Sequence, residues 1–243
     1  MTVKEMNSLH IITPVKDSFD STLETIQAVL SSRLEPPHTY TVYNDFSTPE
    51  NTARLEQAAG EMGFKLVNLS DLTSHPSPNY LLVLQLERRA CLEEDAALLI
   101  VESDVIVKPD TLQGLWDSAC QHPDTGIAAA VTVDEDGNIN YPYQFLQGRK
   151  DQVIDSNKHC SFCCSLLTTE LLRKVDFDKL DGSKNWFDVT ISHLALKSGL
   201  HNYIHTTLPV VHRPHSSRPW KLLKYKNPLK YYLLKWIKRH DKI

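Results

Sequence analysis

Residues 98–112, LLIVESDVIVKPDTL, place acidic side chains inside an apolar run. Glu102, Ser103 and Asp104 interrupt the run, and apolar residues resume directly after them. An isolated carboxylate is costly in an apolar interior, so a buried strand carries one only where the charge is paired, bound to a metal or placed at the strand's end. We therefore expect Glu102 and Asp104 to mark a strand end or a binding site.

Short apolar runs alternate with helical patterns through the N-terminal half. The patterns predict strands in SLHIITPV, HTYTVYND, FKLVNL and AALLIVESD, and helices in STLETIQAVLSS, FSTPENTARLEQAAGEMG and NYLLVLQLERRACLEE. Ser21 and Glu24 have the spacing of a capping box. Thr48, Pro49 and Gly63 are typical of the start and end of a helix. Strands separated by helices predict right-handed βαβ crossovers and a Rossmann-like, mostly parallel α/β sheet with helices on both faces.

Polar residues follow several of these strands, at residues 13–17, 44–45 and 102–104. Each group taken alone fits a turn, a cap or a solvated acid. Together they fall at the carboxyl edge of one parallel sheet, where α/β proteins bind ligands. Neither GxGxxG nor GxxxxGK[ST] occurs, so a phosphate cradle of those kinds is excluded. The oxygen ligands of Asp104 suit Mg²⁺ or Mn²⁺, which could hold a diphosphate instead.

Composition limits the classes of protein to consider. The chain has 243 residues, 41% of them hydrophobic and 23% charged, which is enough for one α/β domain or two small ones. A formal net charge of -4 argues against a nucleic-acid binder. The first apolar patch, residues 9–12, is too short for a signal peptide or a membrane span, so we expect a cytoplasmic protein.

Three of the five cysteines, Cys160, Cys163 and Cys164, stand in HCSFCCSLLTT beside His159. Cys-x-x-Cys next to His is one half of a zinc-site pattern. A second pair at zinc-knuckle spacing is missing from the sequence. We therefore favour small packing residues in a reduced cytosol over a metal site.

An ordered set of segments resembles glycosyltransferase family 2. In the first half these are LHIITPVKDSFDSTLETIQAVLSS, TVYNDFSTPEN and LLIVESDVIVKPDTL; in the second they are HCSFCCSLLTTELLRKVDFDKL and NWFDVTISHLALKSGLHNYIHTTLPVVHRPHSS. The resemblance covers about residues 8–217. It implies a GT-A fold over 1–217, with a nucleotide-binding half at about 8–110, an acceptor half at about 111–217, and a separate tail at 218–243.

The resemblance implies a role for individual residues. Asp45 matches the acid that binds the nucleotide base, and Glu102 and Asp104 match the first and last acids of the DxD motif. Asp188 matches the general base of inverting members, and His212 a late metal ligand. The metal ligands implied are thus Asp104 and His212, and the implied donor-binding residues are Thr13, Pro14, Val15, Asp17, Asp45, Asn79, Glu102, Ser103 and Asp104.

The implied activity is a metal-dependent, inverting transfer of a sugar from a nucleotide diphosphate, most simply UDP. An acid such as Asp188 would remove the proton of the acceptor hydroxyl, and Mn²⁺ or Mg²⁺ would stabilise the leaving diphosphate. The acceptor would be a polysaccharide or a glycolipid. From the residues alone, Asp188 could also be an acid that interacts with a helix dipole, and His212 a hydrogen-bonded strand-end histidine.

The chain departs from the family pattern at several residues in or beside these motifs. Glu102 replaces the usual Asp, Phe187 replaces the Glu before Asp188, and Val15 with Lys16 replaces an aromatic residue and Asn. A catalytically silent nucleotide-sugar-binding module is therefore an alternative, and donor turnover distinguishes the two. A sugar nucleotidyltransferase is a weaker alternative, because the glycine-rich loop typical of that class is missing after the first strand.

The tail, RPWKLLKYKNPLKYYLLKWIKRHDKI, predicts an amphipathic helix after Asn227 and Pro228. Its apolar stripe consists of Leu229, Tyr232, Leu233, Trp236 and Ile237, and its basic residues include Lys230, Lys235, Lys238 and Arg239. The stripe could dock on the catalytic domain or on a second subunit. It could instead lie on the cytoplasmic face of a membrane, where each lysine contributes about 1 kcal/mol.

Overall fold

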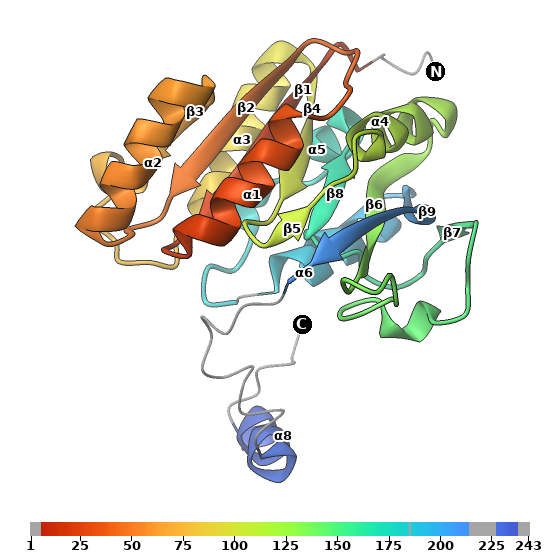
Figure 1. Cartoon of the computed structure of the whole chain (residues 1–243). Coiled ribbons are helices and arrows are strands. Elements are labelled where there is room, and N and C mark those ends of the chain that lie inside the picture. Colours follow the sequence, from red (N-terminus) through yellow and green to blue (C-terminus); the bar gives the residue numbers. More distant parts are fainter. Residues whose placement is uncertain (1–5, 185, 214–226, 238–243) are drawn as a thin grey trace. The chain divides into compact units, whose positions relative to one another are not determined.

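The computed structural model describes residues 6–184, 186–213 and 227–237, except the side chains of 228 and 234–237. The chain divides into two compact units, Met1–His212 and Arg213–Ile243. The first unit holds a sheet with helices on both of its faces, and the second holds helix α8 (Figure 1). None of the helices among the described residues combines the length and apolarity needed to span a bilayer.

The elements follow the alternation expected from the sequence. The strands are β1 Ser8–Val15, β2 His38–Asn44, β3 Lys65–Asn68, β4 Ala96–Val101, β5 Val105–Ile106, β6 Thr125–Val133, β7 Val153–Asp155, β8 Cys164–Leu167 and β9 His201–His212. The helices are α1 Phe19–Leu30, α2 Pro49–Met62, α3 Tyr80–Glu94, α4 Thr111–Gln121, α5 Thr169–Lys174, α6 Phe187–Lys197 and α8 Pro228–Ile237. Short 3₁₀ turns are η1 Leu69–Asp71, η2 Gln144–Leu146 and η3 Phe177–Lys179.

The sheet has the order β3-β2-β1-β4-β8-β6-β9-β5, and β7 also pairs with β9. The first four strands in that order are parallel, which confirms the predicted βαβ units. Strand β8 enters antiparallel between β4 and β6, whereas β9 runs parallel to β6. The apolar run of β8 did not indicate its direction, because a strand buried on both faces has the same pattern in either orientation.

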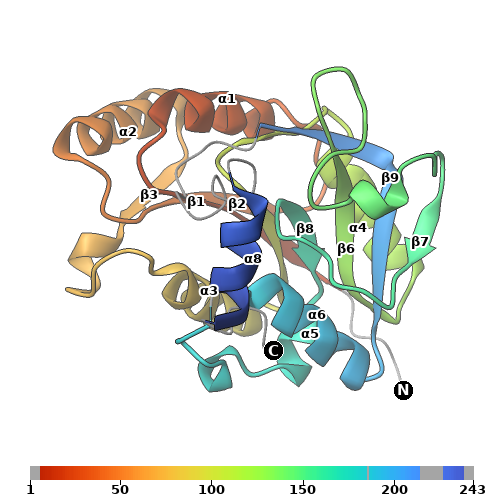
Figure 2. The same cartoon turned by 90° about the horizontal axis from the view of Figure 1, so that it is seen from below.

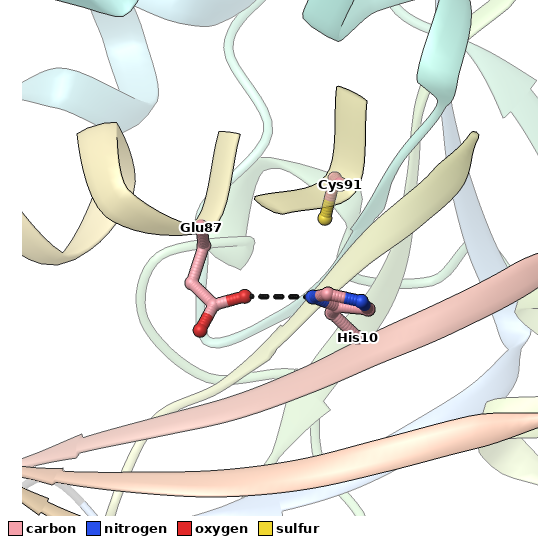
Figure 3. Close-up of side chains that lie close together, drawn as sticks. All are labelled: His10, Glu87 and Cys91. Carbon is pink, nitrogen blue, oxygen red and sulfur yellow. Dashed lines mark hydrogen bonds and ion pairs between the residues drawn. The ribbon is translucent and has the colours of Figure 1, made fainter. Parts of the chain in front are cut away.

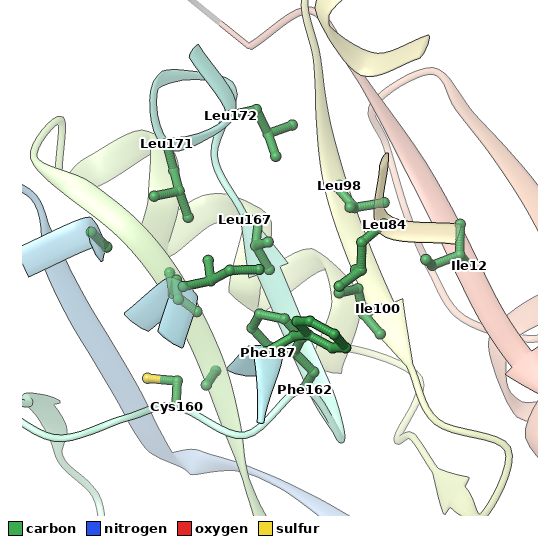
Figure 4. Close-up of a cluster of buried hydrophobic side chains, with 14 of the residues drawn as sticks. Ile12, Leu84, Leu98, Ile100, Cys160, Phe162, Leu167, Leu171, Leu172 and Phe187 are labelled. Atoms are coloured by element: carbon green, nitrogen blue, oxygen red, sulfur yellow. The ribbon is translucent and has the colours of Figure 1, made fainter. Parts of the chain in front are cut away.

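Two apolar layers hold the helices against the sheet. On one face α1, α2 and α4 pack on residues such as Leu9, Ile11 and Leu99. On the other, α3, α5 and α6 pack on Ile12 and its neighbours, as Figures 2 and 4 show. Alternation along each strand sends successive side chains to the two faces. The mostly parallel sheet is therefore covered on both sides, as predicted.

The ends of the first two helices test two predictions about capping. Helix α2 begins and ends as expected: the Thr48 hydroxyl accepts a hydrogen bond from Asn51 N, and Gly63 closes the helix in the left-handed conformation. The prediction of a capping box at Ser21 and Glu24 is wrong, because the N-cap residue of α1 is Ser18. Helix α1 begins earlier, at Phe19, because that ring is buried in the core beneath the Arg54 guanidinium.

Helix α8 begins where the sequence predicted it. Asn227 Oδ1 accepts a hydrogen bond of 3.1 Å from Lys230 N, and Pro228 is the first helical residue. The side chains of Leu229, Tyr232 and Leu233 are exposed. The rest of the predicted stripe and of the basic face lies outside the described residues or has side chains outside them, namely Lys235, Trp236, Ile237, Lys238 and Arg239.

The two glycines near the end of α2 provide a stability test with opposite signs. Gly63 has φ 78, where a Cβ costs about 1 kcal/mol, so Gly63→Ala should lower the free energy of unfolding by about that amount. Gly60 lies inside the helix with open space at its Cβ position, so Gly60→Ala should raise it by about 0.5–1 kcal/mol. Urea unfolding of both variants measures the difference. Equal effects would contradict this account of the helix end.

Candidate active site

The carboxyl ends of β1, β2 and β4 meet at one edge of the sheet. Val15 pairs with Asn44, and Asp45 N donates a hydrogen bond of 2.8 Å to Val15 O. Strand β4 is buried throughout and stops at Val101, one residue before Glu102. The structure therefore brings the predicted polar strand ends together along this edge.

The loop after β1 is tied to the start of α2. Asp17 N donates to Ser47 Oγ at 2.8 Å, and Asp17 Oδ1 accepts from Thr48 N at 2.8 Å and from Asn51 Nδ2 at 3.3 Å. The hydrogen bond from Thr48 N lowers the pKa of Asp17 more than partial burial raises it. Asp17 is thus held ionised, with φ 55, in a rigid turn at the sheet edge.

Asp45 joins the end of β2 to the start of α3. Its Oδ2 accepts from Ser77 Oγ at 2.7 Å and from Asn79 N at 2.9 Å, and its Oδ1 accepts from Asn79 Nδ2 at 2.8 Å. Asn79 is buried and also donates to His75 O. The sequence predicted Asp45 and Asn79 as separate donor-binding residues, and the structure places them in direct contact.

Asp104 and His212 come together through the pairing of β5 with β9. Val105 pairs antiparallel with His212, and this register places His212 Nε2 3.6 Å from Asp104 Oδ2. Both side chains are largely buried. His212 Nδ1 donates to Tyr141 O at 3.0 Å, so in neutral imidazole Nε2 carries the lone pair that faces Asp104.

Electrostatics at this position involve Glu102 and Cys163 as well. Burial lowers the pKa of His212, but the hydrogen bond and charge of Asp104 outweigh it, and the net shift is upward. Burial and the charge of Glu102 raise the pKa of the Cys163 thiol. The thiol is therefore protonated and donates to Glu102 Oε2 at 3.3 Å.

These side chains fit a divalent cation. One potential ligand atom each from Glu102, Cys163 and His212 lies within 4.8 Å of the other two. Asp104 supplies a further carboxylate beside His212 Nε2. Carboxylate oxygens with one imidazole nitrogen suit Mn²⁺ or Mg²⁺, and both carboxylates come from the loop that directly follows the buried β4.

Asp188 lies in the first turn of α6, and its Oδ1 accepts a hydrogen bond of 2.9 Å from Val189 N. Burial and then the charge of Asp188 raise the pKa of the Cys160 thiol, whereas the raised pKa of Tyr143 comes mainly from burial, with Asp188 as its smallest cause. Tyr143 in turn accepts a hydrogen bond of 2.9 Å from Ser161 N, two residues before Cys163. Helix α6 contacts the 160–163 segment through Ser192 Oγ, which accepts a hydrogen bond of 3.0 Å from Cys160 N, and Glu102 contacts the same segment through Cys163.

Phe187, at the position where the family pattern has an acid, is a core residue. The residue is 6% exposed and packs in the apolar layer between α6 and the sheet (Figure 4). Its ring lies 6.4 Å from that of Tyr80. A carboxylate at this depth would need a partner. The substitution therefore fits the packing of α6 in this chain.

Some predicted donor-binding residues do not present their side chains at the edge. Thr13 is fully buried and its hydroxyl bonds Tyr40 at 2.9 Å, while Val15 packs in the core with α1. Pro14 is half-buried and Ser103 is buried. Of the predicted set, the polar side chains assembled at the edge are Asp17, Asp45, Asn79, Glu102, Asp104 and His212.

The sequence did not single out Cys163 or the Tyr141 carbonyl. Cys160 and Cys164 are fully buried, as the packing interpretation expects. Cys163 instead contacts Glu102. The sequence signal that could have indicated a role for Cys163 at the site was a soft sulfur ligand in the HCSFCC segment. The contribution of Tyr141 is a backbone oxygen, which residue type cannot indicate.

No protein-family model and no curated protein matches the chain in sequence. Solved structures do match in fold. The chain superposes on S. aureus TarS 1-349 with a TM-score of 0.61 and 15% identity, covering 84% of this chain and 60% of that one. On the mannosyltransferase PcManGT from Pyrobaculum calidifontis, in complex with GDP-Man and Mn²⁺, the TM-score is 0.63 with 13% identity, covering 97% and 66%. The chain has a GT-A-like glycosyltransferase fold.

A second TarS structure, in complex with UDP-GlcNAc, matches with a TM-score of 0.60 and 15% identity, over 90% of this chain and 65% of that one. The chain thus spans about two thirds or less of the length of these glycosyltransferases. What the shared fold supplies here is the arrangement of the sheet edge. Roles for individual residues must come from the local geometry.

The contacts of Asp45 predict a measurable loss of stability. Asp45→Ala leaves the donors on Ser77 and Asn79 without a charged acceptor, so we expect the free energy of unfolding to fall by about 2 kcal/mol. Ser77→Ala removes one donor and should cost less than about 1 kcal/mol. Urea denaturation compares them. If Asp45→Ala lowered the free energy of unfolding no more than Ser77→Ala does, the stabilising role of the Asp45 contacts would be contradicted.

Proposed function

We propose that the protein is a metal-dependent, inverting glycosyltransferase that uses a nucleotide-diphosphate sugar, with UDP as the nucleotide. The observation that carries the proposal is the meeting of Asp104 and His212 directly after β4, beside Glu102. This meeting occurs on a glycosyltransferase fold, at the sheet edge that also holds Asp45. Complexes of similar folds with UDP-GlcNAc and with GDP-Man and Mn²⁺ support a donor of this chemical class.

Asp45 and its contacts would bind the nucleotide. A carboxylate has about four acceptor positions, and Asn79 and Ser77 occupy three of those of Asp45. The remaining capacity could accept the ring N–H of a uracil base. The hydrogen bonds already present fix the direction of the carboxylate, which reduces the ordering that donor binding would cost.

Asp104 and the Nε2 atom of His212 would hold the cation, with Glu102 beside them. A bound Mn²⁺ or Mg²⁺ supplies charge that neutralises the diphosphate as it leaves. The Tyr141 carbonyl keeps the proton of His212 on Nδ1, which leaves Nε2 available as a ligand. The Cys163 thiol donates a hydrogen bond to Glu102 and would orient that carboxylate.

Asp188 would act as the general base. An inverting transfer needs a carboxylate that takes the proton of the acceptor hydroxyl as the hydroxyl attacks C1 of the sugar. Support for this role comes from the place of Asp188 in the first turn of α6, a helix that contacts the 160–163 segment through Ser192, while Glu102 contacts that segment through Cys163. We expect a polysaccharide or a glycolipid to supply the hydroxyl.

Asp104 and Asp188 should have separable roles. Asp104→Ala should weaken Mn²⁺-dependent UDP binding, measured by calorimetry, because it removes the carboxylate beside His212. Asp188→Asn should leave UDP binding near normal and lower the rate of UDP release from a UDP-sugar by about 100-fold or more, the scale of a lost general base.

Asp117→Ala, which removes an exposed acid on α4, is the matched control and should behave as the parent protein. Normal turnover in Asp188→Asn would disprove the general-base assignment. UDP binding without any consumption of UDP-sugars by the parent protein would favour the silent binding module.

We also propose that the tail attaches the protein peripherally to an anionic membrane. Leu229, Tyr232 and Leu233 expose apolar area on α8, and exposed Lys230 accompanies them. Lipid-linked acceptors would be met at such a surface.

The parent protein should sediment with anionic vesicles, and this sedimentation should weaken as salt is added. Deleting residues 227–243 should abolish the sedimentation and leave UDP binding intact. Equal sedimentation of both proteins would contradict membrane binding, and loss of solubility on truncation would favour docking on protein.

A further inference from the structure

A second group of potential metal ligands lies at the amino end of β1, away from the carboxyl edge that carries the candidate active site. His10 is the third residue of β1, and Glu87 and Cys91 lie on the facing side of α3 (Figure 3). The spacing of Glu87 and Cys91 is i, i+4, so both side chains project from one face of the helix. These three residues are called the β1–α3 cluster below.

The cluster is compact and withdrawn from solvent. One potential ligand atom each from His10, Glu87 and Cys91 lies within 4.8 Å of the other two, and the residues are 7%, 5% and 0% exposed. His10 Nδ1 and Glu87 Oε2 are 3.0 Å apart. A tetrahedral zinc ion with bonds of about 2.0–2.3 Å holds its ligand atoms roughly 3.3–3.7 Å apart, which small side-chain rotations would reach here.

Two further residues occupy the positions that partners of metal ligands take. His10 Nε2 lies 3.2 Å from Glu94 Oε2, so a carboxylate can accept the second ring N–H while Nδ1 faces the cluster. The Tyr43 hydroxyl donates to Glu87 Oε1, the oxygen that does not face His10. A carboxylate on the far nitrogen of a histidine and a hydrogen bond to a ligating carboxylate are the usual second contacts of zinc ligands.

The chemistry of the three donors selects the ion. Burial and the charges of Glu87 and Glu94 raise the pKa of the Cys91 thiol, so without a cation the thiol stays protonated and donates to Ala97 O at 3.7 Å. A dication would replace that proton. Its charge would then balance one thiolate and one carboxylate beside a neutral imidazole. Sulfur, nitrogen and oxygen ligands together suit Zn²⁺, whereas Mg²⁺ and Mn²⁺ prefer oxygen.

We propose that His10, Glu87 and Cys91 form a zinc-binding site that joins β1 to α3. The site is independent of the cation proposed for Asp104 and His212. It shares no residue with that group and lies near the amino end of β1, whereas Glu102 and Asp104 follow the carboxyl end of β4. Zinc bound there stabilises the packing of α3 on the sheet.

Cobalt substitution of the full chain tests the site directly. Co²⁺ bound by a thiolate gives a charge-transfer absorption in the near ultraviolet. One equivalent of zinc should displace the Co²⁺ and remove this absorption. Cys91→Ser should remove this absorption. Cys163→Ser is the matched control, because its sulfur belongs to the other ligand group, and it should keep the absorption. Loss of the absorption in Cys163→Ser with retention in Cys91→Ser would overturn the proposal.

A surface variant keeps the test valid if Cys91→Ser folds poorly. The Glu94 side chain is 60% exposed, so Glu94→Gln should fold normally and weaken zinc affinity by about 10–100-fold, measured by competition with a chromophoric chelator. Glu93→Gln, on the neighbouring exposed residue, should leave the affinity unchanged. Zinc should also raise the melting temperature of the parent protein and of Asp104→Ala alike. Absence of one tight equivalent of zinc in both would refute the site without bearing on the transferase activity.

Discussion

Strand β4 is buried along its whole length, and that burial decides where the acids of the candidate active site can stand. A carboxylate within the strand would lose its hydration with nothing to replace it. The strand therefore ends at Val101, and Glu102 and Asp104 follow at the first positions where partners are within reach. Their partners, Cys163 and His212, come from much later in the chain. The buried strand thus determines both the position of the acids and the need for distant residues to contact them.

The sheet supplies those distant residues by changing direction. After four parallel strands, β8 inserts antiparallel next to β4, and its preceding loop brings Cys163 to Glu102. Strand β9 then runs back parallel to β6, and its last residue pairs with the short β5. This pairing places a histidine against Asp104. The parallel half of the sheet positions the loops after its strands, and the mixed half closes the site from the other side.

The parallel half could be predicted from the sequence because its signals are local. Alternating apolar runs, the cap at Thr48 and the glycine at Gly63 each depend on a few neighbouring residues. The start of α1 was predicted wrongly because the burial of Phe19 against Arg54 of the next helix outweighs the local capping pattern. The direction of β8 and the contact between Asp45 and Asn79 depend on tertiary pairing. The resemblance to a family identified the residues of the edge, but it could not reveal that Thr13 and Val15 turn into the core.

Helix α3 is held at both of its ends by polar contacts to the sheet. Asp45 binds the start of the helix through Asn79 at the carboxyl edge, and His10 binds its middle through Glu87 and its last residue through Glu94 nearer the opposite edge. A helix of 15 residues is a stiff rod of about 22 Å. If the rod shifts on the sheet, both ends change together. A ligand bound at one end would then change the affinity for a ligand at the other end. The effect is reciprocal, because each ligand changes the affinity for the other by the same factor.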